Sequence, residues 1–167
     1  MKTINGRAWA YGANIDTDAL APIGSYQGTG DLSAGAKNCL MHMDPDFAKN
    51  VREGDVFVAT DNMGIGSSRE TAPLFLHKLG IRVVIAKSFA RIFYRNAFNV
   101  GLPSLVCPNA GDIAMGDQLV VDPSTGVIIN ETQGTKYHCQ PIPDHLMEIV
   151  GAGGLMAYLE RKLKKSA

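Results

Sequence analysis

The sequence contains 167 residues, which is the length of a single domain and argues against a large self-contained multidomain enzyme. Its 16 lysines and arginines balance 16 aspartates and glutamates, so no net charge would draw the protein to nucleic acid or to an anionic membrane. Charged residues make up 19% and hydrophobic residues 46% of the chain, a balance that suits a large core and a face buried against a partner.

The N-terminal part of the chain predicts one strand followed by loops. Residues 7–11 have the apolar and aromatic composition of a strand, and a polar loop over 14–18, the acidic loop, follows them. Residues 24–35 are rich in glycine, serine and threonine and contain too few apolar side chains to pack as an element. We therefore expect a flexible loop over about 23–36.

The middle of the chain predicts two strand–helix pairs in succession. Strands are expected over 55–59 and 82–86, because both segments are apolar and rich in β-branched residues. Helices are expected over 71–79 and 89–97, the first with Pro73 in its first turn, where a missing N–H costs little. This order favours a βαβ unit with parallel strands.

The last third of the chain predicts an antiparallel arrangement followed by helix. Residues 118–122 and 126–130 flank a Pro-Ser-Thr turn and predict a hairpin, to which 135–140 could add a third strand. The pattern over 143–165 is helical and is interrupted by glycines within 151–154. This part is therefore expected to differ in architecture from the parallel middle section.

Three cysteines, Cys39, Cys107 and Cys139, are far apart and odd in number. None has the C-x-x-C spacing that would chelate zinc or anchor an iron–sulfur cluster, and no pair among the four histidines has metal-ligand spacing. We expect free, buried thiols in a reducing compartment. The sequence shows no signal peptide and no stretch near the roughly 18 apolar residues of a membrane span, so we expect a soluble, cytoplasmic protein.

The strongest local signal is the glycine-rich segment over 64–70, which reads Gly-Ile-Gly-Ser-Ser-Arg-Glu between a predicted strand and a predicted helix. Its glycines permit close backbone approaches, and the following helix end offers N–H groups to an anion. Ser67 and Ser68 add hydroxyls, and Arg69 adds a two-pronged donor for a carboxylate or phosphate. The segment predicts an anion site; the alternative is a turn in which Ser68 only caps the helix.

The acidic loop carries two carboxylates, Asp16 and Asp18, directly after the first predicted strand. If they lie close together, they could share a proton, bind a cation or orient a cationic side chain such as Arg69. The alternative is an Asx-type turn with solvated acids. The residues of this loop alone leave these interpretations open.

Three blocks of sequence, residues 12–18, 64–70 and 85–103, resemble in order and spacing the small subunits of 3-isopropylmalate dehydratases, free-standing counterparts of the swivelling domain of aconitase. The resemblance covers essentially the whole chain. It implies an α/β fold, a single swivelling β/β/α domain over 1–167 with a mixed sheet and flanking helices. It also implies a large partner subunit, in a heterodimer or heterotetramer, that holds a [4Fe-4S] cluster, while this chain itself binds no cofactor or metal.

The same resemblance implies a hydro-lyase of leucine biosynthesis, active only with its large subunit, that moves a hydroxyl between neighbouring carbons of a small hydroxy-dicarboxylate. Ser67 would be the alkoxide-like base that removes the proton α to a carboxylate, stabilised by backbone N–H donors and a helix end. Arg69 and Ser68 would hold a substrate carboxylate. Asp18 would lie at the edge of the active site near them. Asp16 is grouped with the substrate-binding residues, as a structural neighbour of Asp18.

The loop over 23–36 bears on the substrate. In family members that accept a third carboxylate, such as homoaconitase, an arginine in this loop pairs with it, whereas residues 22–30 here contain neither arginine nor lysine. Tyr26 and Gln27 would suit an apolar or mildly polar substituent, as in 3-isopropylmalate. The loop also departs from that of isopropylmalate enzymes, which leaves 2,3-dimethylmalate and citramalate or citraconate as alternative substrates and disfavours homoaconitate. A non-catalytic anion-binding module of the same fold is the alternative function.

Overall fold

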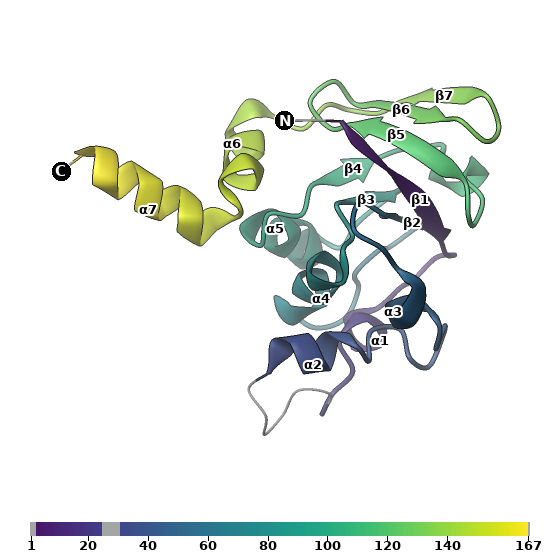
Figure 1. Cartoon of the computed structure of the whole chain (residues 1–167), viewed down its shortest axis with the longest axis horizontal. Helices are drawn as coiled ribbons and strands as arrows, with labels where there is room; N and C mark the ends of the chain where they lie inside the picture. The colour runs from purple at the N-terminus through teal and green to yellow at the C-terminus, as the bar shows by residue number, and fades with distance from the viewer. Residues whose placement is uncertain (1–2, 25–30, 167) are drawn as a thin grey trace.

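The computed structural model describes residues 3–24 and 31–166, and within them the dominant feature is a seven-stranded mixed sheet (Figure 1). The strands are β1 (Ile4–Ala10), β2 (Val56–Ala59), β3 (Val83–Ala86), β4 (Ser104–Val106), β5 (Gln118–Asp122), β6 (Val127–Asn130) and β7 (Thr135–His138). Their order across the sheet is β4-β3-β2-β1-β5-β6-β7. Helices flank the sheet, so the predicted α/β fold with a mixed sheet is confirmed.

Strand β1 joins two differently organised halves of the sheet. Its residues 8–10 pair with β2 in parallel, whereas its residues 4–7 pair with β5 in antiparallel fashion. Strands β3 and β4 extend the parallel half, and β6 and β7 extend the antiparallel half. The predicted βαβ unit and the predicted antiparallel strands are therefore both confirmed. Strand β1 begins before the predicted residue 7 because its first residues pair with β5.

The described residues form seven helices and one 3₁₀ turn. They are α1 (Thr17–Leu20), α2 (Leu32–Ala36), α3 (Phe47–Asn50), α4 (Thr71–Leu79), α5 (Arg91–Asn99), α6 (Asp144–Ala152) and α7 (Leu155–Ser166), with the 3₁₀ turn over Ala110–Asp112. Helices α6 and α7 follow the last strand, and the others lie between strands. Helices α4 and α5 are the crossover connections of the parallel half, as the sequence predicts. Helices α1 and α2 both contact α4.

The parallel half of the sheet is buried on both faces. Successive residues of β2 alternate between two cores, with Phe57 in the first cluster and Val56 and Val58 in the second. Helices α1 to α4 contribute to the first cluster, while α6 and the antiparallel strands contribute to the second. Strands that are buried on both faces are continuous apolar runs, which explains why β2 and β3 can be predicted from sequence.

Part of the flexible loop expected over 23–36 is a helix. Helix α2 begins after Asp31, whose Oδ1 accepts hydrogen bonds from the backbone N–H groups of Ser33 (2.9 Å) and Ala34 (3.2 Å). Ala36 at its other end is buried in the first core cluster. The loop prediction is wrong for this helix, because packing against α4 rather than apolar content stabilises it.

Three other short elements are not predicted from the sequence. Helix α1 takes up the end of the acidic loop and includes Asp18, and helix α3 and strand β4 have no predicted counterpart. Strand β4 has only three residues, too few to show a period, and forms through its pairing with β3. Tyr26 and Gln27 belong to residues 25–30, which lie outside the described residues.

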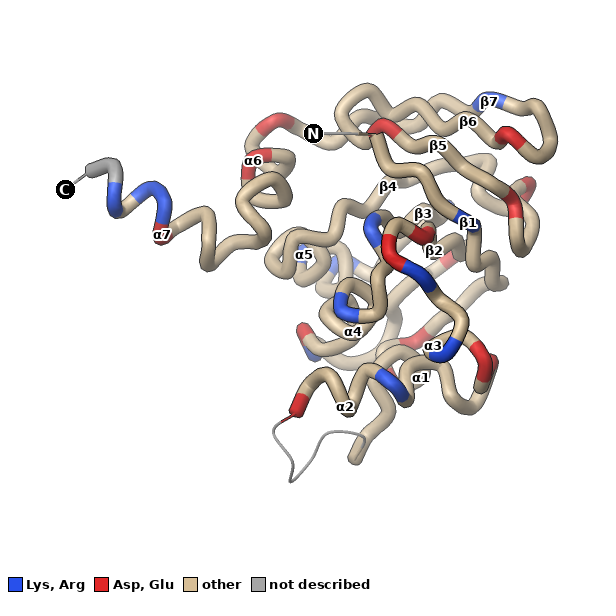
Figure 2. Tube along the Cα trace, in the orientation of Figure 1, with Lys and Arg blue, Asp and Glu red and all other residues tan. Residues whose placement is uncertain are grey.

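The C-terminal segment consists of two helices separated at the predicted glycine break. Gly153 and Gly154 have φ values of 91° and 110°, and their N–H groups donate to the carbonyls of Val150 (2.9 Å) and Ile149 (2.9 Å). Helix α7 extends away from the body of the molecule (Figure 1). Lysine and arginine gather at its C-terminal end, where the helix dipole favours cations (Figure 2). None of the described helices combines the length and apolar character needed to cross a membrane.

Gly154→Ala is expected to lower the free energy of unfolding by about 2–4 kcal/mol. A Cβ at this position would lie 2.5 Å from the carbonyl oxygen of Asn99, in a backbone conformation that L residues rarely adopt. Urea unfolding measures the loss. Gly151→Ala is the matched control, because no atom lies within 4 Å of its Cβ and alanine favours a helix by up to about 1 kcal/mol. Equal stability of the two variants would contradict this account of the junction.

Candidate active site

The loops that follow β1 and β2 meet at one edge of the parallel half. These two strands are parallel neighbours, so their carboxyl ends point to the same edge of the sheet. The N–H of Gly64 donates to the carbonyl of Ile15 (2.7 Å), and the N–H of Thr17 donates to the carbonyl of Ile65 (2.8 Å). These two hydrogen bonds join the acidic loop to the glycine-rich segment, the two candidate regions of the sequence.

Glycine is required at two positions of the glycine-rich segment. Gly64 and Gly66 have φ values of 80° and 109°. A Cβ at Gly64 would lie 2.1 Å from Cγ of Phe93, and a Cβ at Gly66 would lie 2.9 Å from Oγ1 of Thr17. The close approach of this segment to α1 and α5 therefore depends on the missing side chains.

Ser67 presents its hydroxyl at the surface while its neighbours hold it in place. Its backbone N–H donates to Oγ1 of Thr17 (2.9 Å), and the two hydroxyl oxygens lie 3.1 Å apart in a hydrogen bond. The Nε–H of Arg69 donates to the Ser67 Oγ at 2.7 Å. Thr17 is only 1% exposed, so a buried side chain anchors an exposed one. The sequence analysis missed Thr17, although this residue lies between Asp16 and Asp18, the two acids named there.

The two acids of the acidic loop have different partners. Asp18 forms an ion pair with Nη2 of Arg69, so it orients the cationic side chain, one of the three roles considered from sequence. Asp16 caps helix α1, since its Oδ1 accepts a hydrogen bond from the N–H of Ala19 (2.6 Å). Asp18, Arg69 and Ser67 therefore form one connected group, while Asp16 supports the backbone beneath it.

Ser68 does not cap helix α4, so the alternative interpretation of the glycine-rich segment is wrong on this point. The N-cap residue is Glu70, which makes no side-chain capping hydrogen bond. The backbone carbonyl of Ser68 instead accepts a hydrogen bond from Nδ2 of Asn96 (3.0 Å), and this bond joins the segment to helix α5. The segment is thus held by α1 on one side and by α5 on the other.

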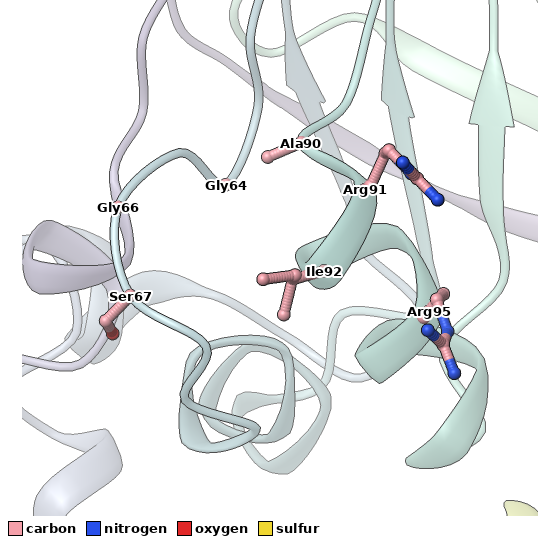
Figure 3. Close-up of a pocket in the computed structure, with 7 residues that line it drawn as sticks. All are labelled: Gly64, Gly66, Ser67, Ala90, Arg91, Ile92 and Arg95. Atoms are coloured by element: carbon pink, nitrogen blue, oxygen red, sulfur yellow. The ribbon is translucent and has the colours of Figure 1, made fainter.

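An open hollow of about 380 Å³ lies between the glycine-rich segment and the first turns of α5 (Figure 3). It is lined by Gly64, Gly66, Ser67, Ala90, Arg91, Ile92 and Arg95. Ile92 extends toward the Ser67 side, whereas both guanidinium groups extend away from Ser67. The glycine-rich segment with Ser67 forms one wall of this hollow, and the apolar side chains of Ala90 and Ile92 lie on the other. Sequence analysis did not single out the α5 residues, although they fall within a block that carries the family resemblance.

The described residues include no group of three or more His, Cys, Asp or Glu side chains that could hold a metal ion. Cys39 lies in the first core cluster, and burial raises the pKa of its thiol, which therefore stays protonated. Cys107 and Cys139 lie in the second cluster, where a hydrogen bond from the Cys139 thiol lowers the pKa of Cys107 to about 7. Three thiols divided between two cores do not form the ligand set of an iron–sulfur cluster.

The chain is similar to proteins of one family over nearly its whole length. The family model described as the aconitase C-terminal domain matches residues 31–110. A 3-isopropylmalate dehydratase small subunit of Methanosarcina mazei is 51% identical over 95% of this chain and 97% of that protein. A small subunit of the same name from Nautilia profundicola is 45% identical over 99% of each chain.

A solved structure is similar in both fold and sequence. The crystal structure of a 3-isopropylmalate dehydratase from Methanocaldococcus jannaschii superimposes with a TM-score of 0.91 and 44% sequence identity. The match covers 99% of this chain and 98% of that one. The likeness therefore includes both halves of the sheet.

Thr17→Val is expected to weaken the anchoring of Ser67, because the Ser67 N–H loses its acceptor while the buried volume is kept. We expect exchange of the Ser67 amide hydrogen to accelerate at least about tenfold, equivalent to roughly 1.4 kcal/mol of lost protection. Hydrogen exchange followed by NMR measures this rate. Thr17→Ser keeps the hydroxyl and should keep the protection; equal acceleration in both variants would contradict the role of Oγ1.

Proposed function

Because this chain belongs to the 3-isopropylmalate dehydratase small subunits of the aconitase family, we propose that the surface around Ser67 is its half of an active site shared with the large subunit. The enzyme is a hydro-lyase of leucine biosynthesis, and its small subunit works with a large one. The observation that carries the proposal is the Ser67 Oγ, which Thr17 and Arg69 hold on an exposed segment at the edge of the hollow.

Ser67 acts in this proposal as the base. An ordinary serine hydroxyl is too weakly acidic to be deprotonated at neutral pH, so the alkoxide needs a stabilising neighbour. The Nε–H of Arg69 donates to the Ser67 Oγ at 2.7 Å, and the guanidinium charge favours the anion. The helix end expected from sequence is a weaker candidate for this role, since α4 begins only at Thr71.

The proton follows a short path in both directions of the reaction. In the dehydration, the Ser67 alkoxide takes the proton from the carbon α to a carboxylate, and the electrons of that C–H bond form the double bond as hydroxide leaves the neighbouring carbon. In the rehydration, the Ser67 hydroxyl returns the proton to one carbon and becomes the alkoxide again, while hydroxide adds to the neighbouring carbon. One residue thus serves as base and then as acid.

Arg69 and Ser68 bind a substrate carboxylate in this proposal. The Nε and Nη2 atoms of Arg69 are engaged by Ser67 and Asp18, and Nη1, which has no hydrogen-bond partner among the described residues, is the donor proposed for a ligand. Ser68 is exposed next to it and adds a hydroxyl donor. Asp18 stays at the edge of the site and keeps the guanidinium in place, and Asp16 acts by capping α1.

We propose that the large subunit holds the [4Fe-4S] cluster, in a heterodimer or heterotetramer with this chain. The separated thiols of Cys39, Cys107 and Cys139 support this division, because they offer no ligand set on this side. When bound in the partner, the cluster would supply a Lewis acid for the departing hydroxyl. Buried free thiols also suit the reducing cytoplasm as the location of the enzyme.

The proposed substrate is 3-isopropylmalate, a hydroxy-dicarboxylate with an apolar branch. The relatives carry this substrate in their names, and residues 22–30 contain no arginine or lysine that would pair with a third carboxylate. Tyr26 and Gln27 of that segment are proposed to face the apolar branch.

Ser67→Ala is expected to lower kcat of the assembled enzyme by about 10²–10⁴-fold, because the substitution removes the atom that accepts the proton. Assembly with the large subunit should be unchanged, as measured by size-exclusion chromatography with light scattering. Ser68→Ala is the comparison variant and should mainly raise KM. An unchanged kcat in Ser67→Ala would remove this residue from the role of base.

Arg69→Lys is expected to lower kcat by about 10²-fold, because an ammonium group cannot donate to Ser67 and pair with Asp18 in the same planar geometry. Steady-state kinetics of the assembled enzyme test this expectation. A rise in KM with kcat unchanged would mean that Arg69 only binds substrate and does not stabilise the Ser67 alkoxide.

The purified chain alone is expected to show no turnover, while addition of the large subunit restores it. Reconstituted enzyme should be assayed with 3-isopropylmalate, 2,3-dimethylmalate, citraconate and homoaconitate, and kcat/KM should be highest for 3-isopropylmalate. Turnover by this chain by itself would contradict the shared site. A higher kcat/KM for another of these acids would replace the proposed substrate.

A further inference from the structure

Two arginines on the α5 wall of the hollow have no acidic partner. Arg91 and Arg95 are both exposed, and no carboxylate or other side chain among residues 3–24 and 31–166 pairs with either guanidinium. In contrast, Arg7, Arg69 and Arg82 each have a carboxylate within 4.0 Å. Arg91 and Arg95 are four residues apart on a helix and therefore share one face.

An exposed apolar side chain accompanies these two charges. Ile92 is 50% exposed, although the neighbouring Phe93 is buried in the first core cluster. Figure 3 shows Ile92 extending over the hollow toward Ser67, while the guanidinium groups of Arg91 and Arg95 extend to the other side of the helix. An exposed isoleucine next to two exposed arginines on one helix has the composition of a protein-binding surface, in which arginine and apolar anchors are enriched.

Helix α5 holds this surface rigidly and connects it to the base. The ring of Phe93 stacks on Phe89 with centroids 6.3 Å apart and lies directly against Gly64. Nδ2 of Asn96 donates to the carbonyl of Ser68, next to Ser67 in the chain. A partner that fixes the outer face of α5 therefore also fixes the position of the glycine-rich segment.

We propose that Arg91, Ile92 and Arg95 form the surface on which the large subunit docks, and that the large subunit meets it with an apolar pocket flanked by carboxylates. The inference rests on the proposed function, because a shared active site requires the partner to close over this same hollow. The α5 wall is continuous with the Ser67 wall in one hollow. The partner that completes the site therefore contacts both walls.

The direction and number of the charges favour this partner over other ligands. Both guanidinium groups point away from Ser67, so they are poorly placed to hold a carboxylate of a substrate that reacts at Ser67. The chain has a formal net charge of zero, and Figure 2 shows lysine and arginine interspersed with aspartate and glutamate along the described residues, which is not the pattern of an extended basic path for a nucleic acid. Two unpaired positive charges beside an exposed apolar side chain match a protein surface of opposite charge with an apolar pocket.

Charge reversal in Arg91→Glu/Arg95→Glu tests the proposal by its effect on subunit affinity. Titration of the purified small subunit into the purified large subunit, by calorimetry or biolayer interferometry, gives Kd at about 50 mM and about 300 mM NaCl. We expect Kd at low salt to rise at least about 30-fold. Arg91→Lys/Arg95→Lys should stay within about tenfold of the unmodified protein, because it keeps the charges, and Ile92→Ala should weaken binding at both salt concentrations.

Arg161→Glu is the matched control, since this exposed arginine belongs to α7 and not to the hollow. It should leave Kd unchanged, and circular dichroism should give all variants the same helix content. An unchanged Kd after charge reversal overturns docking through α5. If Kd is unchanged but KM for the substrate rises, the guanidinium groups bind substrate instead. Unmodified subunits that fail to associate would instead overturn the proposed function itself.

Discussion

Gly66 lies against the buried hydroxyl of Thr17, and the geometry of the candidate site depends on this contact. Oγ1 of Thr17 accepts a hydrogen bond from the backbone N–H of Ser67 and contacts the Ser67 hydroxyl, so a residue that is 1% exposed holds an exposed one. The contact is possible because β1 and β2 are parallel neighbours whose loops leave the same edge of the sheet. Any side chain at position 66 would separate the two loops and move Ser67 relative to Arg69.

The arginines near this contact have two different roles. Arg69 is paired with Asp18 and donates to Ser67, so its charge acts inside the site on the oxygen that is proposed to carry the proton. Arg91 and Arg95 have no such partners among the described residues and lie on the wall that a large subunit would cover. A chain that supplies half of an active site leaves its reactive groups exposed until the partner subunit binds. The open hollow beside Ser67 fits this arrangement.

Much of the fold follows from local sequence patterns. Strands β2 and β3 are continuous apolar runs, helix α4 has its proline in the first turn and a glycine at its end, and the β5–β6 hairpin has a clear turn. Helix α2 and strand β4 could not be predicted in this way. Five and three residues show no period, and both elements are stabilised by packing or pairing with distant parts of the chain.

The sequence by itself determined the family and the residue types of the candidate site, because Ser67, Arg69 and Asp18 lie in short blocks whose order and spacing are specific. Only the tertiary structure decided which of these residues contact one another. It separated Asp18, which pairs with Arg69, from Asp16, which caps a helix, and it brought in Thr17 as the anchor. The physical reason is that the contacts of Asp18 with Arg69 and of Thr17 with Ser67 join residues about fifty positions apart. Such contacts depend on the order of the strands and on how their loops meet, which local sequence patterns do not encode.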